Sequence, residues 1–229
     1  MSSPVTENAP VVASETEHRF SSLIAQTEQA VLDHHPAAAH FRYPYVYGPR
    51  QLIPREWSIV RRILDRRPHM IVADGGLTLT THGFSANLAH SVLLAADNAT
   101  ASAGQIYNCG DEQQFTFGQI VQMICKKMNH EFDLISMPYD LALPARPYVS
   151  EQTTHHRLMD TSKIRYELGY RDVNPVEEAL GLTVDWLLSN RPEPGGEIEQ
   201  RLQDRFDYAG EDRVIKTWKN LSTSEFFLN

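Results

Sequence analysis

The sequence has few cysteines, no long apolar run and no surplus of basic residues. Cys109 and Cys125 are the only cysteines among 229 residues and form no CxxC pair, which argues against a disulfide framework and a zinc knuckle. No run approaches the ~20 apolar residues that a membrane helix needs. The net charge of -8 argues against a general affinity for nucleic acid, which requires Lys and Arg concentrated on one surface. We therefore expect a soluble, cytoplasmic protein that binds neither membranes nor nucleic acid.

Three signatures of binding or catalysis are also missing. No GxGxxG or GxxGxxG occurs, and such glycines allow the backbone to approach a dinucleotide pyrophosphate at the start of a helix. The usual dinucleotide cradle is therefore not expected in these residues. The sequence also lacks an HExxH pair and a GxSxG elbow, so we expect neither a metal site nor serine hydrolase chemistry.

Helical and strand patterns alternate along most of the chain. Apolar residues between Phe20 and Val31 recur with helical spacing, and residues 40–47 are rich in aromatic and β-branched types, which predicts one buried strand. Further helices are predicted over 55–65, 87–97, 116–128, 161–168 and 176–189, with further strands over 70–73, 105–109 and 132–136. The alternation indicates an α/β fold.

The ends of the chain and one internal segment break this rhythm. Residues 1–17 read as an irregular lead-in, residues 18–190 as the α/β domain, and residues 191–229 as a loosely attached tail that begins with prolines and glycines. Residues 138–160 contain three prolines and predict a long loop, which is uncommon in a compact domain unless it covers a site. We therefore interpret this loop as a candidate lid.

Three stretches carry the most specific motifs. They are FRYPYVYGPR at 41–50, THGFSANLA at 81–89, and the segment 160–180, which contains two predicted helices. In this order they resemble the NAD-dependent epimerase/dehydratase family, the extended short-chain dehydrogenases/reductases. Asn87 stands where that family usually has Asp. The resemblance implies a partial doubly wound, Rossmann-like parallel sheet with a smaller C-terminal substrate lobe.

The resemblance also implies that the chain is the substrate-side portion of such a protein. The family's catalytic pair is a Tyr and a Lys four residues apart, in which the Lys lowers the pKa of the phenol. No Tyr here is followed four positions later by Lys, and counting back from Tyr43 aligns Phe20 and Ile24 with the pair. Neither side chain can transfer a proton, so the catalytic residues stay unassigned. We expect both residues to lie in the core.

The residues that the resemblance assigns to ligands cluster around the first motif. It implies a substrate site at Tyr43, Tyr45, Arg50, His82 and Arg146, with Pro44 and Val46 beside the nicotinamide of NAD or NADP. Alternation along a strand would place Tyr43, Tyr45 and Tyr47 on one face, where they either line a pocket or simply pack.

Two functions remain open from the sequence. The first is an epimerase, dehydratase or reductase of a sugar nucleotide or another polar small molecule, with weakened cofactor binding. The second is a binding or assembly protein, or a cofactor-independent enzyme, that reuses the substrate pocket. We expect a homodimer through the helix from Phe20 to Leu32, because the family commonly dimerises through this helix, or else a partner chain that supplies the nucleotide-binding half.

Overall fold

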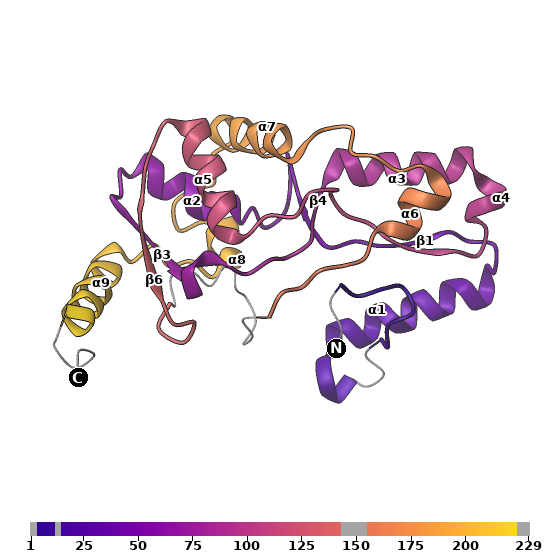
Figure 1. Ribbon diagram of the computed structural model, residues 1–229, viewed down its shortest axis with the longest axis horizontal. Helices are drawn as coiled ribbons and strands as arrows, with labels where there is room; N and C mark the ends of the chain where they lie inside the picture. Colours follow the sequence, from indigo (N-terminus) through magenta and orange to yellow (C-terminus); the bar gives the residue numbers. More distant parts are fainter. Residues whose placement is uncertain (1–3, 12–14, 143–154, 224–229) are drawn as a thin grey trace. The chain divides into compact units, whose positions relative to one another are not determined.

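A computed structural model describes residues 4–11, 15–142 and 155–223. The chain forms two compact units from interleaved segments. Unit 1 comprises Met1–Tyr47, Thr81–Gln114 and Arg157–Val176, and unit 2 comprises Gly48–Thr80, Phe115–His156 and Glu177–Asn229. Figure 1 labels most of the helices and strands of both units.

Unit 1 contains two pairs of short parallel strands and four helices among its described residues. Its elements are α1 (Glu15–His34), β1 (His40–Arg42), β2 (Tyr45–Tyr47), β4 (His82–Phe84), α3 (Ser85–Asp97), α4 (Ala99–Ser102), β5 (Ile106–Asn108) and α6 (Ser162–Leu168). Strand β1 pairs with β5, and β2 pairs with β4. The core of this unit is formed by α3, α6 and the segment from β5 to Cys109, with Tyr107, Cys109, Ile164 and Tyr170 fully buried.

The predicted single strand over 40–47 is wrong, because the chain forms two strands there. Tyr43 and Pro44 separate β1 from β2, and each strand has a different partner. Proline has no N–H to donate to a strand partner, so it interrupts the ladder at this point. β4 was not predicted as a strand, because three residues that include Gly83 carry no clear alternation.

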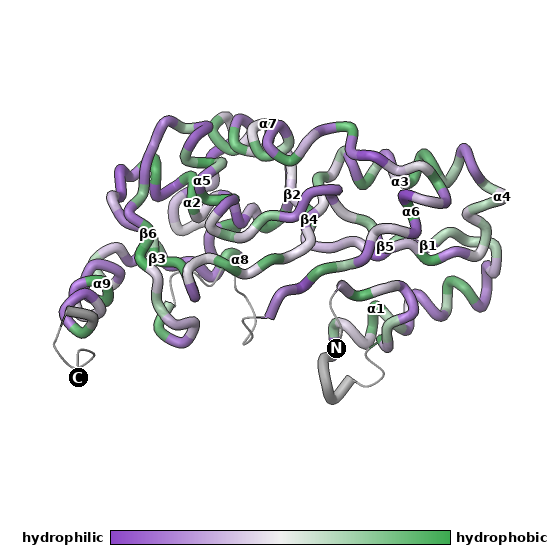
Figure 2. Tube along the Cα trace, in the orientation of Figure 1, coloured by the Kyte–Doolittle hydropathy of each residue, from purple (hydrophilic) through white to green (hydrophobic). Residues whose placement is uncertain are grey.

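Unit 2 is built on one parallel pair, β3 (His69–Ala73) with β6 (Asp133–Met137). Its other elements are α2 (Glu56–Leu64), the short 3-10 helix η1 (Asp74–Gly76), α5 (Phe117–Met128), α7 (Val176–Ser189), α8 (Glu197–Leu202) and α9 (Tyr208–Thr223). Ile71, Ala73, Ile135 and Met137 from the strands form a buried cluster with Ile215 of α9. Figure 2 shows the apolar run of β3 in green. Thr116 caps α5, since its hydroxyl oxygen accepts a hydrogen bond from the Gln119 N–H.

The last part of the chain is attached to unit 2 by a buried ionic network. Arg62 of α2 is 1% exposed and donates to both Asp204 and Glu211. Burial alone would lower the pKa of Arg62, but the two carboxylates raise it overall. The indole of Trp57 and the guanidinium of Arg61 both donate to Glu199 in α8. The expectation of a loosely attached tail is therefore wrong for α8 and α9.

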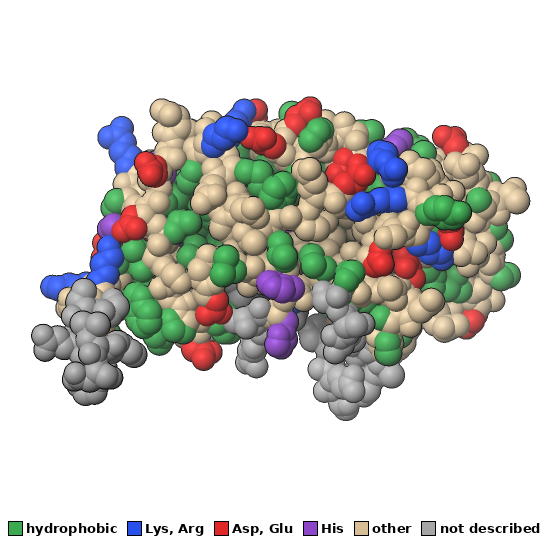
Figure 3. Space-filling view, viewed as in Figure 1, with side chains coloured by type: hydrophobic (Ala, Val, Ile, Leu, Met, Phe, Trp, Pro, Cys, Tyr) green, Lys and Arg blue, Asp and Glu red, His purple; other side chains and the backbone are tan. Residues whose placement is uncertain are grey.

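The α/β class and the parallel pairing are confirmed, since all three strand pairs in the described residues are parallel. None of the described helices combines the length and apolar character needed to cross a membrane. On the face seen in Figure 3, acidic and basic side chains are interspersed.

Candidate functional site

The parallel pair β2–β4 brings two tyrosines and a histidine together. Tyr45 lies opposite His82 in the register, and Tyr47 lies opposite Phe84, so all four side chains share one face of the pair. The ring of His82 lies edge-on to Tyr45, with centroids 5.5 Å apart, and edge-on to Tyr47 at 6.4 Å. Tyr45 and His82 are half-buried, whereas Tyr47 is buried. This face therefore offers an aromatic surface with an imidazole at its centre.

A buried carboxylate lies behind this aromatic face. Asp111 is 1% exposed, and its Oδ1 accepts hydrogen bonds from the Phe84 N–H and the Asn87 amide, both at 3.0 Å. Burial raises the pKa of Asp111 to about 6, although the bonds from Phe84, Asn87 and the Tyr47 hydroxyl work in the opposite direction. Gly110 precedes it at a close approach, where an added Cβ would lie 2.5 Å from Cγ2 of Thr81. Through these two hydrogen bonds, buried Asp111 holds the end of β4 against the start of α3.

Asn87 explains why the second motif departs from the family's usual Asp. Its Nδ2 donates to Asp111 and to the Asn174 carbonyl, both at 3.0 Å, while its Oδ1 accepts the N–H groups of Val173 and Asn174. An ionised carboxylate at this position could donate to neither acceptor and would lie next to the carboxyl group of Asp111. The amide thus joins α3 to the segment that follows α6.

The sequence interpretation missed an acidic pair that completes this cluster. Glu112 and Asp172 exchange hydrogen bonds, since each carboxylate accepts the backbone N–H of the other residue, at 2.8 and 3.0 Å. The buried Tyr170 hydroxyl donates to Asp172 at 2.9 Å. Burial raises the pKa of Asp172 from its ordinary value. No regular spacing links residues 112 and 172, so only the fold could reveal the pair.

Helix α1 has the opposite orientation from the one expected. Phe20 is 69% exposed and Ile24 is 52% exposed, while the polar residues Ser22 and Glu28 are buried. The expectation that Phe20 and Ile24 lie in the core is therefore wrong. Glu28 accepts two hydrogen bonds from Arg42 of β1, at 2.6 and 2.8 Å, and these bonds lower its pKa. Since this ion pair holds α1 against β1, the helix turns its apolar stripe outward.

The other residues of the first motif lie outside the tyrosine–histidine group. Tyr43 is 44% exposed and stacks on Phe41 at 6.2 Å, so the prediction that three tyrosines share one strand face is wrong for Tyr43. Pro44 lies in the break between β1 and β2. Val46 is opposite Gly83, on the face of β2 away from Tyr45 and Tyr47, and is 38% exposed.

Of the two predicted arginines and the predicted lid, the structure describes Arg50 and the two ends of the lid segment. Arg50 is exposed in unit 2 and adopts a positive φ of 66°. Arg146 lies outside the described residues, as does most of the predicted lid. The described ends of the lid segment are anchored, because Tyr139 and Ala142 join the core of unit 2 and Met159 N donates to Thr81 in unit 1.

The described residues do not fit a dinucleotide pyrophosphate in the usual manner. Strand β4 continues directly into α3 with no glycine-rich turn, and the Asp111 carboxylate accepts the Phe84 N–H at that junction. The Gly75–Gly76 turn after β3 lies against α5, since a Cβ on Gly76 would lie 3.0 Å from the Gly118 nitrogen. In the described parts of the chain, no three His, Cys, Asp or Glu side chains gather as a metal would require.

Comparison with known proteins connects this geometry to solved enzymes. No family model matches the chain. A UDP-glucuronic acid 4-epimerase from Bacillus cereus, solved with UDP-glucuronic acid and NAD, superposes with a TM-score of 0.63 and 17% identity, over 83% of this chain and 58% of that one. The chain has the epimerase/dehydratase fold. The fold implied by the three motifs is thereby confirmed.

Two sequence relatives are more similar in identity, and the chain covers a smaller share of their length. A dTDP-glucose 4,6-dehydratase from Xanthomonas campestris is 27% identical over 153 residues, which are 65% of this chain and 40% of that protein. The uncharacterized protein y4nL from Sinorhizobium fredii is 24% identical over 170 residues, or 65% of this chain and 47% of that protein. The chain thus matches less than half the length of these relatives.

Proposed function

We propose that residues 1–229 form the substrate-side part of an NAD(P)-dependent epimerase/dehydratase-type protein. In this proposal they bind a sugar nucleotide or a similar polar molecule but do not carry out acid–base or hydride chemistry by themselves. The observation that carries the proposal is the β2–β4 pair, which belongs to the epimerase/dehydratase fold and presents Tyr45 and His82 together on one face.

The chemistry of this face suits a sugar nucleotide. Tyrosine and histidine rings provide flat apolar surface for a sugar or base, and their polar atoms provide hydrogen bonds to hydroxyl groups. Both rings are half-buried and therefore partly accessible. Arg50 and Arg146 remain proposed contacts to a phosphate or carboxylate, because a guanidinium matches those groups.

Two features of the chain support the proposal that it does not catalyse the family's reaction by itself. Phe20 and Ile24 stand where the resemblance aligns the Tyr and Lys of the catalytic pair, and neither titrates. The residues also lack the glycine turn that holds a pyrophosphate, so binding of NAD or NADP is proposed to be weak. Two buried, unpaired cysteines suit a reducing compartment such as the cytoplasm.

Ligand-observed NMR with UDP-glucose and dTDP-glucose tests the proposed binding. We expect saturable binding that Tyr45→Leu weakens by about fivefold or more, because stacking and a hydroxyl are both lost. Tyr166→Leu is the matched control, since Tyr166 is 92% exposed on α6 of the same unit. Equal binding by the two variants, or no binding of either nucleotide by the wild type, would refute the proposal.

A second function, assembly, is favoured by the exposed stripe of α1. Phe20, Leu23 and Ile24 are between 44% and 69% exposed, which is unusual for adjacent apolar residues on a 20-residue helix. We infer that this stripe is covered by a second copy of the chain, with a partner chain that supplies a nucleotide-binding half as the alternative.

A further inference from the structure

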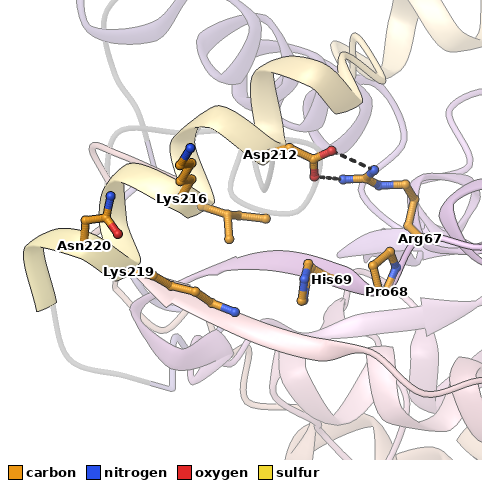
Figure 4. Close-up of a pocket in the computed structure, with 8 residues that line it drawn as sticks. Arg67, Pro68, His69, Asp212, Lys216, Lys219 and Asn220 are labelled. Atoms are coloured by element: carbon orange, nitrogen blue, oxygen red, sulfur yellow. Dashed lines mark hydrogen bonds and ion pairs between the residues drawn. The ribbon is translucent and has the colours of Figure 1, made fainter. Parts of the chain in front are cut away.

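Unit 2 contains a pocket of about 520 Å³ between the start of β3 and α9, apart from the tyrosine–histidine face. Arg67 and His69 come from the β3 side, and Asp212, Lys216, Lys219 and Asn220 come from α9 (Figure 4). The four α9 residues recur at helical spacing and therefore line one side of that helix. Two segments that are far apart in the sequence thus provide basic side chains to one cavity.

The cationic groups around the pocket are incompletely neutralised. Asp212 forms an ion pair with Arg67, while Asp133 of β6 is shared between His69 and Lys219, at 3.1 and 3.2 Å. Lys216 makes no hydrogen bond or ion pair with any described residue. Three permanent cations therefore face two carboxylates, before the histidine is counted.

One buried nitrogen atom in the pocket wall lacks a partner. Nε of Arg67 is buried and has no hydrogen-bond partner among the described residues, whereas Nδ1 of His69 pairs with Asp133 at 3.1 Å. Buried polar groups without partners are rare and cost free energy, so such groups beside a cavity are typical of a binding site. A guanidinium Nε–H in particular can only donate, so its partner must be an acceptor.

We propose that this pocket binds the phosphate group of a small phosphorylated molecule. A phosphate offers several acceptor oxygens in different directions, which suits donors from Arg67, His69 and Lys216 better than a planar carboxylate would. The volume of about 520 Å³ lies within the usual range for small-molecule sites and leaves room for more than the phosphate itself. Because the chain has a net charge of -8, its overall field repels anions, and the attraction must be local.

Titration with inorganic phosphate in a phosphate-free buffer at constant ionic strength tests the proposal, with binding followed by calorimetry. We expect saturable binding that Lys216→Gln weakens by about fivefold or more, because a charge-assisted hydrogen bond is lost. Asp133→Asn should strengthen binding, since it removes the carboxylate that competes for His69 and Lys219. All substituted side chains are exposed, and a thermal melt of each variant checks that it folds.

Lys126→Gln is the matched control, because Lys126 is exposed in the same unit and its partner is Glu177, outside the pocket. It changes the net charge by the same amount as Lys216→Gln. The proposal is overturned if phosphate does not saturate the wild type, if the two lysine variants weaken binding equally, or if Asp133→Asn fails to strengthen it.

Discussion

Asp111 is a buried acid that accepts two hydrogen bonds within unit 1. The Phe84 N–H and the Asn87 amide both donate to it, yet burial still raises its pKa to about 6. The folded chain therefore holds this proton more tightly than the unfolded chain does, where the pKa is near the ordinary 3.8. Between these two values stability falls as pH rises, and the loss is complete above about pH 6.

Asp111→Asn should remove this dependence on pH. The amide oxygen can still accept from Phe84 and Asn87, but the group no longer titrates. The free energy of unfolding of the variant, relative to the wild type, should rise by about 2 to 3 kcal/mol between about pH 4 and about pH 7. Urea unfolding followed by circular dichroism measures it. A difference that does not change with pH would contradict the pKa assigned to Asp111.

At the scale of elements, α1 is a helix whose charged face is inside and whose apolar stripe is outside. The Glu28–Arg42 ion pair fixes this orientation within unit 1. The occupant that we propose for this stripe is a second copy of the chain.

Ile24→Glu should separate the proposed dimer without unfolding unit 1, because Ile24 is exposed within it. An interface of about 800 Å² per partner cannot easily bury an unpaired charge. Light scattering after size exclusion should give twice 26.0 kDa for the wild type and 26.0 kDa for the variant. Leu93→Glu, at a 63% exposed position on α3, is the control and should remain dimeric. A wild-type mass of 26.0 kDa at tens of micromolar would refute both a homodimer and an obligate interface on α1.

Arg62 attaches α9 and the segment before it to α2. Arg62→Ala leaves Asp204 and Glu211 buried without their counter-charge, so the free energy of unfolding of unit 2 should fall by about 3 to 5 kcal/mol. All three tryptophans belong to unit 2, so fluorescence during urea unfolding reports this loss. Arg201→Ala, which removes an exposed i,i+4 pair with Glu197, should change stability by less than about 0.5 kcal/mol. Similar effects of the two variants would show that the buried network is not what holds the helices.

Elements were predictable from the sequence where apolar residues define a face. The predicted helices over 116–128 and 176–189 agree closely with α5 and α7, and the strand over 70–73 agrees with β3. Helices α8 and α9 were not predicted because each makes a buried ionic contact that apolar periodicity does not register, through Glu199 in α8 and Glu211 in α9. For α1 the helical spacing predicted the helix correctly but predicted the wrong buried face, because the buried face contains the Glu28–Arg42 ion pair. For the site, the Tyr45–His82 neighbourhood followed from the motifs, whereas the Asp111 and Asp172 contacts required the fold.

At the scale of the whole molecule, the chain combines the epimerase/dehydratase fold with a sequence that contains no GxGxxG or GxxGxxG fingerprint. It aligns with 58% of a solved epimerase that holds both UDP-glucuronic acid and NAD. Its described residues present the tyrosine–histidine face, and the Gly195–Gly196 pair that leads into α8 is not part of a GxGxxG pattern. The central proposal is that these 229 residues bind the sugar-nucleotide substrate but do not bind the dinucleotide.

Isothermal titration of this chain with NAD, NADH, NADP and NADPH tests that claim most directly. We expect no saturable binding below millimolar concentrations, because the sequence contains none of the glycine fingerprints whose backbone N–H groups hold a pyrophosphate. A sugar nucleotide titrated in the same cell serves as the positive control for a folded site. A micromolar dissociation constant for any of the four dinucleotides would contradict the account.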